Sequence, residues 1–224
     1  MPENKYEEIL LHDVKNFLTG ISASAGLFID GYLGTLNEAQ MNAIETINRA
    51  NSKLIRILTD YQDLASLENK SYLLKSDSFT IGDLLKNMDW IIKSAKKEKK
   101  DIKIEADYGS KIFADKDLIS RILENLLLNA IKQSKREAET TLKISIKKDQ
   151  AVFEVINPTE ELPKEGLEKI FDKDFKIAFP KMKSMIASGH GFYFCRLAVE
   201  AQAGKISVNN ENGVRYSFIL PQKG

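Results

Sequence analysis

The segment 114–134, ADKDLISRILENLLLNAIKQS, carries apolar residues at every fourth position, which predicts a helix over 116–134 with one strongly apolar face. Asn125, Asn129 and Lys132 follow one another at spacings of four and three, so they share a second face. Carboxamide oxygens suit Mg²⁺ and a lysine ammonium suits phosphate oxygens, which makes this face a candidate binding site. The alternative is a solvated helix face. Two asparagines inside an apolar helix are locally unfavourable, however, and this favours a site.

The sequence around this segment predicts a mixed α/β domain over residues 69–224. The expected helices are 81–95 and 191–201, and the expected strands are 102–106, 142–146, 152–156, 206–208 and 216–220. The strands alternate apolar and polar residues with a period of two, whereas the helices show the longer helical period. Asn212-Gly213 is a strong turn signal between the last two strands. These elements predict an α/β sandwich with its own core.

Residues 1–68 differ from the rest, because 6–67 show only helical periodicity and contain no proline. Each half carries an apolar stripe: Leu10, Val14, Phe17, Ile21 and Phe28, then Ile44, Ile47, Leu54, Leu58 and Tyr61, interrupted at Asn51. Residues 31–34, GYLG, end the first helix, and Thr35 with Glu38 has the form of a capping box that starts the second. We predict an antiparallel hairpin over 1–68 that forms a homodimeric four-helix bundle through these stripes.

His12 lies in the segment LHDVKNFL, residues 11–18. In the heptad register of the first helix it falls at the position that points away from the bundle axis, which predicts an exposed side chain. An exposed neutral imidazole is an accessible nucleophile. The Asp13 carboxylate could fix its tautomer, and the Asn16 amide, one turn further on, could hold a water molecule or a phosphoryl oxygen beside it. The alternative is an ordinary surface histidine on a polar helix face.

Composition excludes several classes of function. Among 224 residues, 33 are Lys or Arg and 32 are Asp or Glu, so the net charge of +1 gives no general attraction to nucleic acid. No apolar run is long enough for membrane insertion, and the N-terminus lacks the basic start of a signal peptide. The single cysteine, Cys195, excludes an internal disulfide and fits a reducing, cytoplasmic location. Two histidines 178 positions apart do not suit a zinc site.

The two motifs together resemble those of two-component sensor histidine kinases. The segment 11–18 resembles the family's H-box, commonly written HDLKNPL, although Phe17 stands where the family usually has proline. The segment 125–132 is similar to its N-box, NLLxNAxK, without a gap. The resemblance covers nearly the whole chain, because 1–68 is similar to the dimerisation and histidine phosphotransfer domain and 69–224 to the Bergerat-type ATP-binding domain. The implied fold class is α+β, a dimeric four-helix bundle followed by a histidine-kinase-like α/β sandwich.

The resemblance also implies a reaction and its participants. His12 would attack the γ-phosphate of ATP and pass the phosphoryl group to an aspartate of a response regulator receiver domain. Asp13 would orient and activate His12, and Asn16 would assist phosphatase chemistry. Asn129 would bind Mg²⁺. The implied phosphate contacts are Asn125 and Lys132.

The first departure from the family pattern lies at residues 157–163, NPTEELP, where the family has the nucleotide-binding motif DNGPGIP. Asn157 replaces an aspartate that, in the family, accepts a hydrogen bond from the adenine amino group. A carboxamide oxygen can still accept such a bond, without the charge. Thr159 and Glu161 replace two glycines, and their side chains hinder the close backbone approach that glycines allow. Glu161 also brings negative charge toward an anionic nucleotide.

A second glycine motif of the family, GxGLGL, resembles residues 188–196, SGHGFYFCR. Gly189 and Gly191 are kept at a predicted helix start, where main-chain N–H groups can receive phosphate. Tyr193 replaces the third glycine. The segment between Phe171 and Gly189 corresponds to the family's mobile lid over ATP and is unusually apolar for such a loop.

Three functional interpretations remain open at this point. The complete N-box and the intact His12-Asp13 pair favour an autophosphorylating histidine kinase. The altered segment 157–163 and the absence of a sensor domain favour an ATP-independent histidine phosphotransferase that exchanges phosphate between response regulators. A non-catalytic dimeric scaffold that docks regulators is the third, and it has no need for Asn129 and Lys132.

Overall fold

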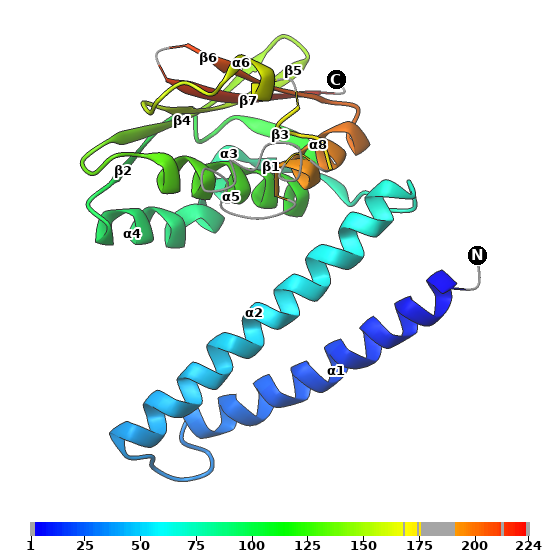
Figure 1. The fold of residues 1–224 in the computed structure, drawn as a ribbon, viewed down its shortest axis with the longest axis vertical. Helices are drawn as coiled ribbons and strands as arrows, with labels where there is room; N and C mark the ends of the chain where they lie inside the picture. Colours follow the sequence, from blue (N-terminus) through cyan, green and yellow to red (C-terminus); the bar gives the residue numbers. More distant parts are fainter. Residues whose placement is uncertain (1–2, 168, 174, 176–190, 212, 223–224) are drawn as a thin grey trace. The chain divides into compact units, whose positions relative to one another are not determined.

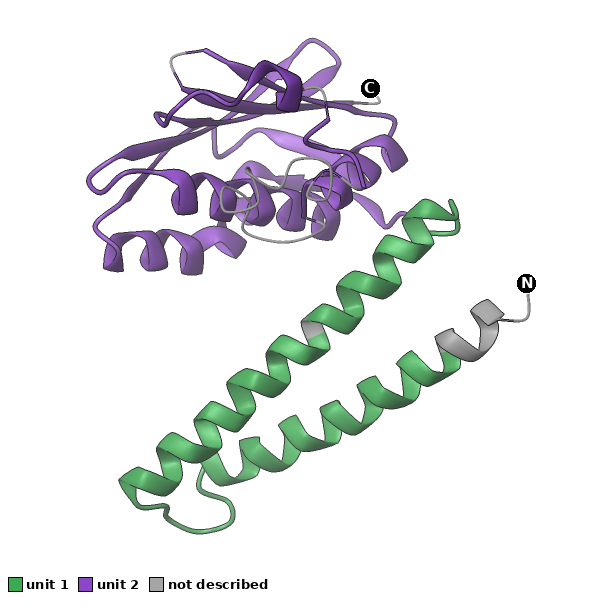
Figure 2. Cartoon of the chain, viewed as in Figure 1, with its two compact units in different colours: residues 1–72 green, residues 73–224 purple. Residues whose placement is uncertain are grey.

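The computed structural model of the protein describes residues 3–167, 169–173, 175, 191–211 and 213–222. The chain folds into two compact units, unit 1 over residues 1–72 and unit 2 over residues 73–224 (Figure 2). The predicted boundary after residue 68 lies at the end of the second helix, four residues before the boundary between the two units. Unit 1 is helical in its described part, whereas unit 2 combines helices with two sheets.

Unit 1 is a hairpin of two long helices, α1 (Glu3–Ile29) and α2 (Glu38–Glu68), which run antiparallel (Figure 1). A capping box starts α2, but its N-cap is Asn37 and not the predicted Thr35. The Asn37 side chain accepts from Gln40 N at 2.9 Å, and Gln40 Oε1 accepts from Asn37 N at 3.0 Å. Both Thr and Asn cap helices, so the sequence signal alone did not decide between two residues two positions apart.

The apolar stripes predicted for the two helices are largely exposed in the single hairpin. The exposed members are Leu10, Phe17, Ile21 and Phe28 on α1, and Ile47, Leu54 and Tyr61 on α2. The hairpin closes around Ala25 on α1, which is 2% exposed, and Asn51 on α2, which is 4% exposed. Asn51 Nδ2 donates to Leu18 O and Ser22 Oγ, both at 2.6 Å. The residue that interrupts the predicted stripe therefore joins the two helices by hydrogen bonds.

Unit 2 contains a five-stranded sheet in the order β2-β4-β5-β7-β6 and a two-stranded sheet of β1 and β3. The strands are β1 (Ser76–Thr80), β2 (Asp101–Ala106), β3 (Lys111–Asp115), β4 (Glu139–Lys147), β5 (Gln150–Asn157), β6 (Lys205–Asn210) and β7 (Val214–Pro221). The helices are α3 (Ile81–Leu85), the 3₁₀ turn η1 (Lys86–Met88), α4 (Asp89–Lys97), α5 (Lys116–Gln133), α6 (Lys164–Leu167) and α8 (Gly191–Ala201). Strands β2 and β4 are parallel, and the other pairs are antiparallel. Helices α4, α5 and α8 lie on one face of the large sheet (Figure 1).

The predicted helices over 116–134 and 191–201 and the five predicted strands are confirmed, with differences of a few residues at their ends. The helix predicted over 81–95 is instead divided into α3 and α4 by η1. Strands β1 and β3 were not predicted. They are five residues long, and β1, with the sequence SDSFT, contains a single large apolar residue, so neither gave a clear period-two signal.

The interior of unit 2 lies between α5 and the large sheet. Phe153 on β5 and Phe218 on β7 stack with their ring centroids 4.3 Å apart, and both are essentially inaccessible to solvent. The apolar side of α5 packs above them, with Leu118, Ile122, Leu126 and Ala130 all fully buried. Helix α5 is therefore anchored along its whole apolar side. Among the described residues, no helix is both long and apolar enough to cross a membrane.

Gly213 directly precedes β7 with a φ angle of +115°, a conformation that residues with a side chain rarely adopt. A Cβ at this position would overlap the main-chain oxygen of Asn157. We expect Gly213→Ala to lower the free energy of unfolding of unit 2 by about 2 kcal/mol or more. Urea denaturation checks this. The control is Gly109→Ala, because a Cβ at Gly109 meets only ordinary van der Waals contact. Equal urea midpoints for the two variants would contradict the prediction.

Candidate phosphotransfer and nucleotide sites

His12 lies on the exposed side of α1, with 70% of its side chain accessible to solvent, as its heptad position predicts. Asn16, one turn further on, has its Nδ2 atom 3.2 Å from His12 Nδ1. An Asp13 carboxylate oxygen lies 3.6 Å from the same ring nitrogen, and 60% of the Asp13 side chain is exposed. The structure therefore brings all three predicted residues together. Both neighbours approach Nδ1, so neither of them occupies Nε2.

The two neighbours of Nδ1 favour different tautomers of His12. Asp13 offers only acceptor oxygens, and its negative charge 3.6 Å from Nδ1 favours the form with hydrogen on Nδ1 and a lone pair on Nε2. That form is the nucleophile. A hydrogen bond donated by Asn16 Nδ2 instead requires a lone pair on Nδ1 and places the hydrogen on Nε2. Asp13 and Asn16 therefore act in opposite directions on the balance between the two tautomers of His12.

The second cluster of predicted residues depends on how α5 begins. Asp115 is 1% exposed and caps the helix, because its Oδ1 accepts from Leu118 N at 3.1 Å. Its Oδ2 accepts from Lys75 N at 2.9 Å, and its main-chain N donates to Gln202 Oε1 at 2.9 Å. These bonds fix the start of α5 to the chain preceding β1 and to the residue just beyond α8. The register of the helix, and with it the direction of each side chain, is therefore set at its N-terminus.

Asn125, Asn129 and Lys132 occupy successive turns of one face of α5. Asn125 Nδ2 donates to Arg121 O at 3.0 Å, and Asn129 Nδ2 donates to Asn125 O at 2.7 Å. Each carboxamide nitrogen is thus used by its own helix, and the oxygen is the part that suits a cation. Asn129 is 1% exposed, whereas Lys132 is exposed. The described residues contain no cluster of three His, Cys, Asp or Glu side chains that could hold a metal, so Mg²⁺ at Asn129 would need phosphate and water oxygens.

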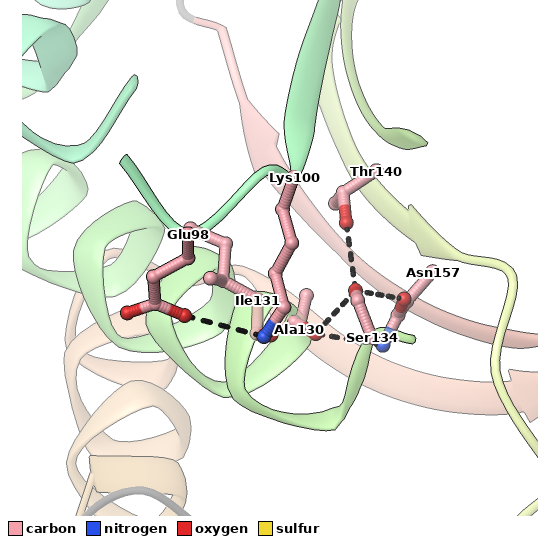
Figure 3. Close-up of polar contacts among 7 residues, drawn as sticks. All are labelled: Glu98, Lys100, Ala130, Ile131, Ser134, Thr140 and Asn157. Carbon is pink, nitrogen blue, oxygen red and sulfur yellow. Dashed lines mark hydrogen bonds and ion pairs between the residues drawn. The ribbon is translucent and has the colours of Figure 1, made fainter. Parts of the chain in front are cut away.

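Asn157, at the end of β5, is completely buried and bonded to the other end of α5 (Figure 3). Its Nδ2 donates to Ala130 O at 3.0 Å, and its Oδ1 accepts from Ser134 Oγ at 2.7 Å. Ser134 Oγ also lies 2.7 Å from Ala130 O and 3.3 Å from Thr140 Oγ1. We call Asn157, Ser134, Thr140 and the carbonyl of Ala130 the α5 clamp. Both polar ends of the Asn157 carboxamide are used within it.

Two further side chains bind the last carbonyl groups of α5. Lys100 has 14% of its side chain exposed, and its Nζ donates to Ile131 O at 2.7 Å while pairing with Glu98 at 3.3 Å (Figure 3). Thr159 Oγ1 donates to Gln133 O at 3.1 Å. A lysine at this position also complements the negative end of the helix dipole. The C-terminal turn of α5 is therefore tied to the chain before β2 and to the chain after β5.

The α5 clamp does not fit the adenine contact that the family resemblance implies for Asn157. A residue that recognises a base must present a polar atom to it, and Asn157 has no exposed surface. The residues that follow also contact the protein itself. Thr159 Oγ1 donates to Gln133 O, and the Leu162 side chain is buried at 2% exposure. Glu161 is exposed.

The predicted phosphate-binding glycines are only partly described. Gly191 is the first residue of α8 and is buried, whereas Gly189 lies outside the described residues, as does most of the predicted lid. Tyr193, which replaces the family's third glycine, is 9% exposed and lies under the Arg196 guanidinium at 5.2 Å from its ring centre. Arg196 also pairs with Asp172 at 2.6 Å. The tyrosine thus has a packing role at the start of α8.

Cys195 on α8 is fully buried, and burial raises the pKa of its thiol well above the usual range. A thiol that stays protonated and inaccessible is unreactive. We expect a thiol reagent to modify native protein at least about a hundredfold more slowly than urea-unfolded protein. Because the chain has one cysteine, this rate reports the opening of unit 2. Rapid modification of the folded protein would contradict the prediction.

Sequence reasoning missed three residues of this region: Ser134, Thr140 and Lys100. Ser134 was included in the predicted helix, although the structure makes it the C-cap of α5. Its hydroxyl was a usable signal, since serine at a helix end often bonds local carbonyls. Thr140 and Lys100 gave no such signal, because Thr140 meets Ser134 only when β4 forms and the partner of Lys100, Ile131, is 31 positions away.

Comparison with known proteins agrees with this geometry. Residues 114–224 match the family described as histidine kinase-, DNA gyrase B-, and HSP90-like ATPase. The chain is 24% identical over 217 residues to the sensor protein KdpD of Clostridium acetobutylicum, covering 95% of this chain and 24% of that protein. Full-length ShkA in complex with AMPPNP shares the fold, with a TM-score of 0.74 and 19% identity over 97% of this chain and 45% of the other. Histidine kinase ThkA in complex with the response regulator protein TrrA has a TM-score of 0.59 and 20% identity, covering 98% of this chain and 64% of the other.

The mixed sheet with helices on one face, and α5 with its two asparagines, define an ATPase domain of the histidine kinase, gyrase B and HSP90 type. Over nearly its whole length the chain is similar in sequence and fold to two-component sensor histidine kinases, with this Bergerat-type domain following an N-terminal helical hairpin. It spans about a quarter of the length of the sensor protein that it matches.

Proposed function

We propose that this chain carries a phosphoryl group on His12 and exchanges it with an aspartate of a response regulator receiver domain. The observation that carries the proposal is the arrangement at His12, which is 70% exposed and approached by Asp13 and Asn16 at Nδ1. An exposed histidine can meet the active site of a docked receiver domain. Support also comes from the relative ThkA, whose structure holds a response regulator.

The chemistry follows from the tautomers of His12. In the form stabilised by Asp13, the Nε2 lone pair attacks phosphorus, the bond from phosphorus to the donor oxygen breaks, and the donor leaves as an oxyanion. The product imidazolium keeps its hydrogen on Nδ1, where the Asp13 carboxylate offsets the positive charge. In the reverse direction a receiver aspartate attacks the same phosphorus and His12 leaves as a neutral ring. Asn16 is placed to hold a water molecule or a phosphoryl oxygen beside the ring.

The first candidate donor is ATP, which makes the chain a histidine kinase core. Asn125, Asn129 and Lys132 support this route, because they lie on successive turns of α5 and can hold Mg²⁺ and phosphate oxygens. Gly191 at the start of α8 adds a helix N-terminus suited to phosphate.

The second candidate donor is a phosphorylated receiver domain, which makes the chain an ATP-independent histidine phosphotransferase of a phosphorelay. The observation that favours this route is the complete burial of Asn157 in the α5 clamp. His12 chemistry is the same in both routes, since only the donor differs.

A homodimer is part of the proposal. The exposed stripes on α1 and α2 contain several large apolar side chains, including Phe17, which is 74% exposed. Such a continuous surface is unfavourable in water and favours association of two hairpins into a four-helix bundle. In sedimentation, a monomer at micromolar concentration would contradict this part of the proposal.

The deciding experiment supplies labelled phosphate from each donor in turn. Protein is incubated with labelled ATP and Mg²⁺, and separately with each labelled receiver domain of its host. Acid-labile, alkali-stable label identifies phosphohistidine. Label from ATP supports the kinase, and label from a receiver domain alone supports the phosphotransferase. Absence of label from every donor would overturn phosphoryl exchange and leave the scaffold.

A further inference from the structure

The position of Asn157 explains why a carboxamide and not a carboxylate stands there. Ala130 O is a hydrogen-bond acceptor 3.0 Å from Asn157 Nδ2, so the group facing it must be a donor. An aspartate would place an acceptor oxygen against another acceptor. On the opposite side, Ser134 Oγ supplies a donor to Asn157 Oδ1 at 2.7 Å. The two ends of the amide are therefore matched to their surroundings.

The clamp also uses its hydroxyl groups fully. Ser134 has one hydroxyl hydrogen to share between Ala130 O and Asn157 Oδ1, each 2.7 Å away. Thr140 on β4 is 1% exposed and lies 3.3 Å from Ser134 Oγ, where it can donate in turn. Buried polar groups that satisfy one another in this way hold each other in place, and breaking one bond leaves a buried partner unpaired.

The chain on both sides of the clamp is held as well. Asn210 on β6 forms a reciprocal pair with the main chain of Leu162, through bonds of 3.0 Å and 2.8 Å. Gly213 packs its main chain so closely against Asn157 O that no side chain fits. Residues 157–162 are thus held by hydrogen bonds at both ends, and each end of the buried Asn157 carboxamide already has a partner within the protein.

We propose that Asn157 does not recognise a nucleobase, because the α5 clamp uses its carboxamide to hold β5 against the C-terminal end of α5. Unit 2 then does not discriminate adenine from other bases, and any nucleoside triphosphate is bound through its phosphate groups alone. This inference rests on the nucleotide route of the proposed function. It is independent of phosphoryl exchange between His12 and a receiver domain.

The first test measures base discrimination in the full chain. Titration calorimetry with Mg²⁺ and either ATP or GTP is expected to give dissociation constants that differ by less than about threefold. If neither nucleotide binds detectably, the proposed binding through the phosphate groups is overturned. A preference for ATP of threefold or more overturns the proposal as a whole. Phosphoryl transfer from a receiver domain, measured on the same preparation, shows separately whether the proposed function stands.

The second test removes a clamp hydroxyl and compares it with a matched serine. Ser134→Ala is expected to lower the midpoint of thermal unfolding by about 3–6 °C, because Asn157 Oδ1 loses its donor. Ser145→Ala on β4 is the control, since within the described part of the chain the buried Ser145 Oγ has no hydrogen-bond partner. It is expected to change the midpoint by less than about 1 °C. Equal midpoints in the two variants would overturn the clamp.

Nucleotide binding by the Ser134→Ala variant separates a clamp from a base-recognition site. If Asn157 contacted adenine, loss of Ser134 would change the orientation of its carboxamide and alter the ratio of ATP to GTP affinity. A clamp leaves this ratio within about threefold of the wild-type value. A larger change in the ratio would overturn the proposal even if the thermal midpoint falls as expected.

Discussion

The His12→Gln variant is expected to acquire no acid-labile label from ATP or from any phosphorylated receiver domain. Glutamine keeps a polar side chain of similar length but has no nucleophilic ring nitrogen. Because 70% of the His12 side chain is exposed, its replacement removes little packing and should leave the hairpin intact. Circular dichroism with an unchanged thermal midpoint confirms that the fold survives, so loss of label reports chemistry alone.

His190 provides the matched control, as the only other histidine of the chain. His190→Gln is expected to keep the label that a receiver domain transfers, because that transfer takes place at His12 on α1. Mapping the label by peptide analysis of the wild type adds a direct reading of the site. Label that is retained by His12→Gln and lost by His190→Gln would place the phosphoryl group on His190 and overturn the proposal.

The long helices of unit 2 could be predicted because their signal is local. Helix α5 repeats an apolar residue every four positions over five turns, and α8 follows a glycine with a continuous apolar face. Each pattern extends over enough residues to exclude a strand. Strand β1, by contrast, has five residues of which one is large and apolar, and it forms only because β3 pairs with it. Short strands of this kind depend on partners that the sequence does not place beside them.

The candidate sites divide in the same way. His12, Asp13 and Asn16 could be grouped from sequence because they lie within one helical turn, and helical spacing alone brings them together. Asn125, Asn129 and Lys132 are a second local group. The α5 clamp could not be predicted, because Ser134 and Asn157 are 23 positions apart and meet only when β5 pairs into the sheet beside α5. The same tertiary contact decides what Asn157 can bind, so residue type alone gave an incomplete answer there.

Asn157→Asp, which restores the residue usual in the family, is expected to destabilise unit 2 by about 3–5 kcal/mol at pH 7. One carboxylate oxygen would replace Nδ2 and lie about 3.0 Å from Ala130 O, where two acceptors repel each other. The site is completely buried, so water cannot solvate the charge. We expect no gain in ATP preference from this variant, since the oxygen that replaces Nδ2 faces Ala130 and not a ligand.

The deficit of the Asn157→Asp variant should depend on pH in a defined direction. Burial beside an acceptor raises the folded-state pKa of an aspartate above its unfolded value of about 3.9, because only the protonated carboxyl can donate to Ala130 O. Stability relative to the wild type is therefore retained below about pH 4 and lost as the pH rises through the raised folded pKa. Urea denaturation of both proteins at several pH values from 4 to 8 measures the difference in their free energies of unfolding. The reactivity of Cys195 provides a second measure of the opening of unit 2. Asn209→Asp, at an exposed position of β6, is the control and should show no such trend. A deficit that is constant with pH would mean that the carboxylate escapes the clamp, and residue 157 would then be able to reach a ligand.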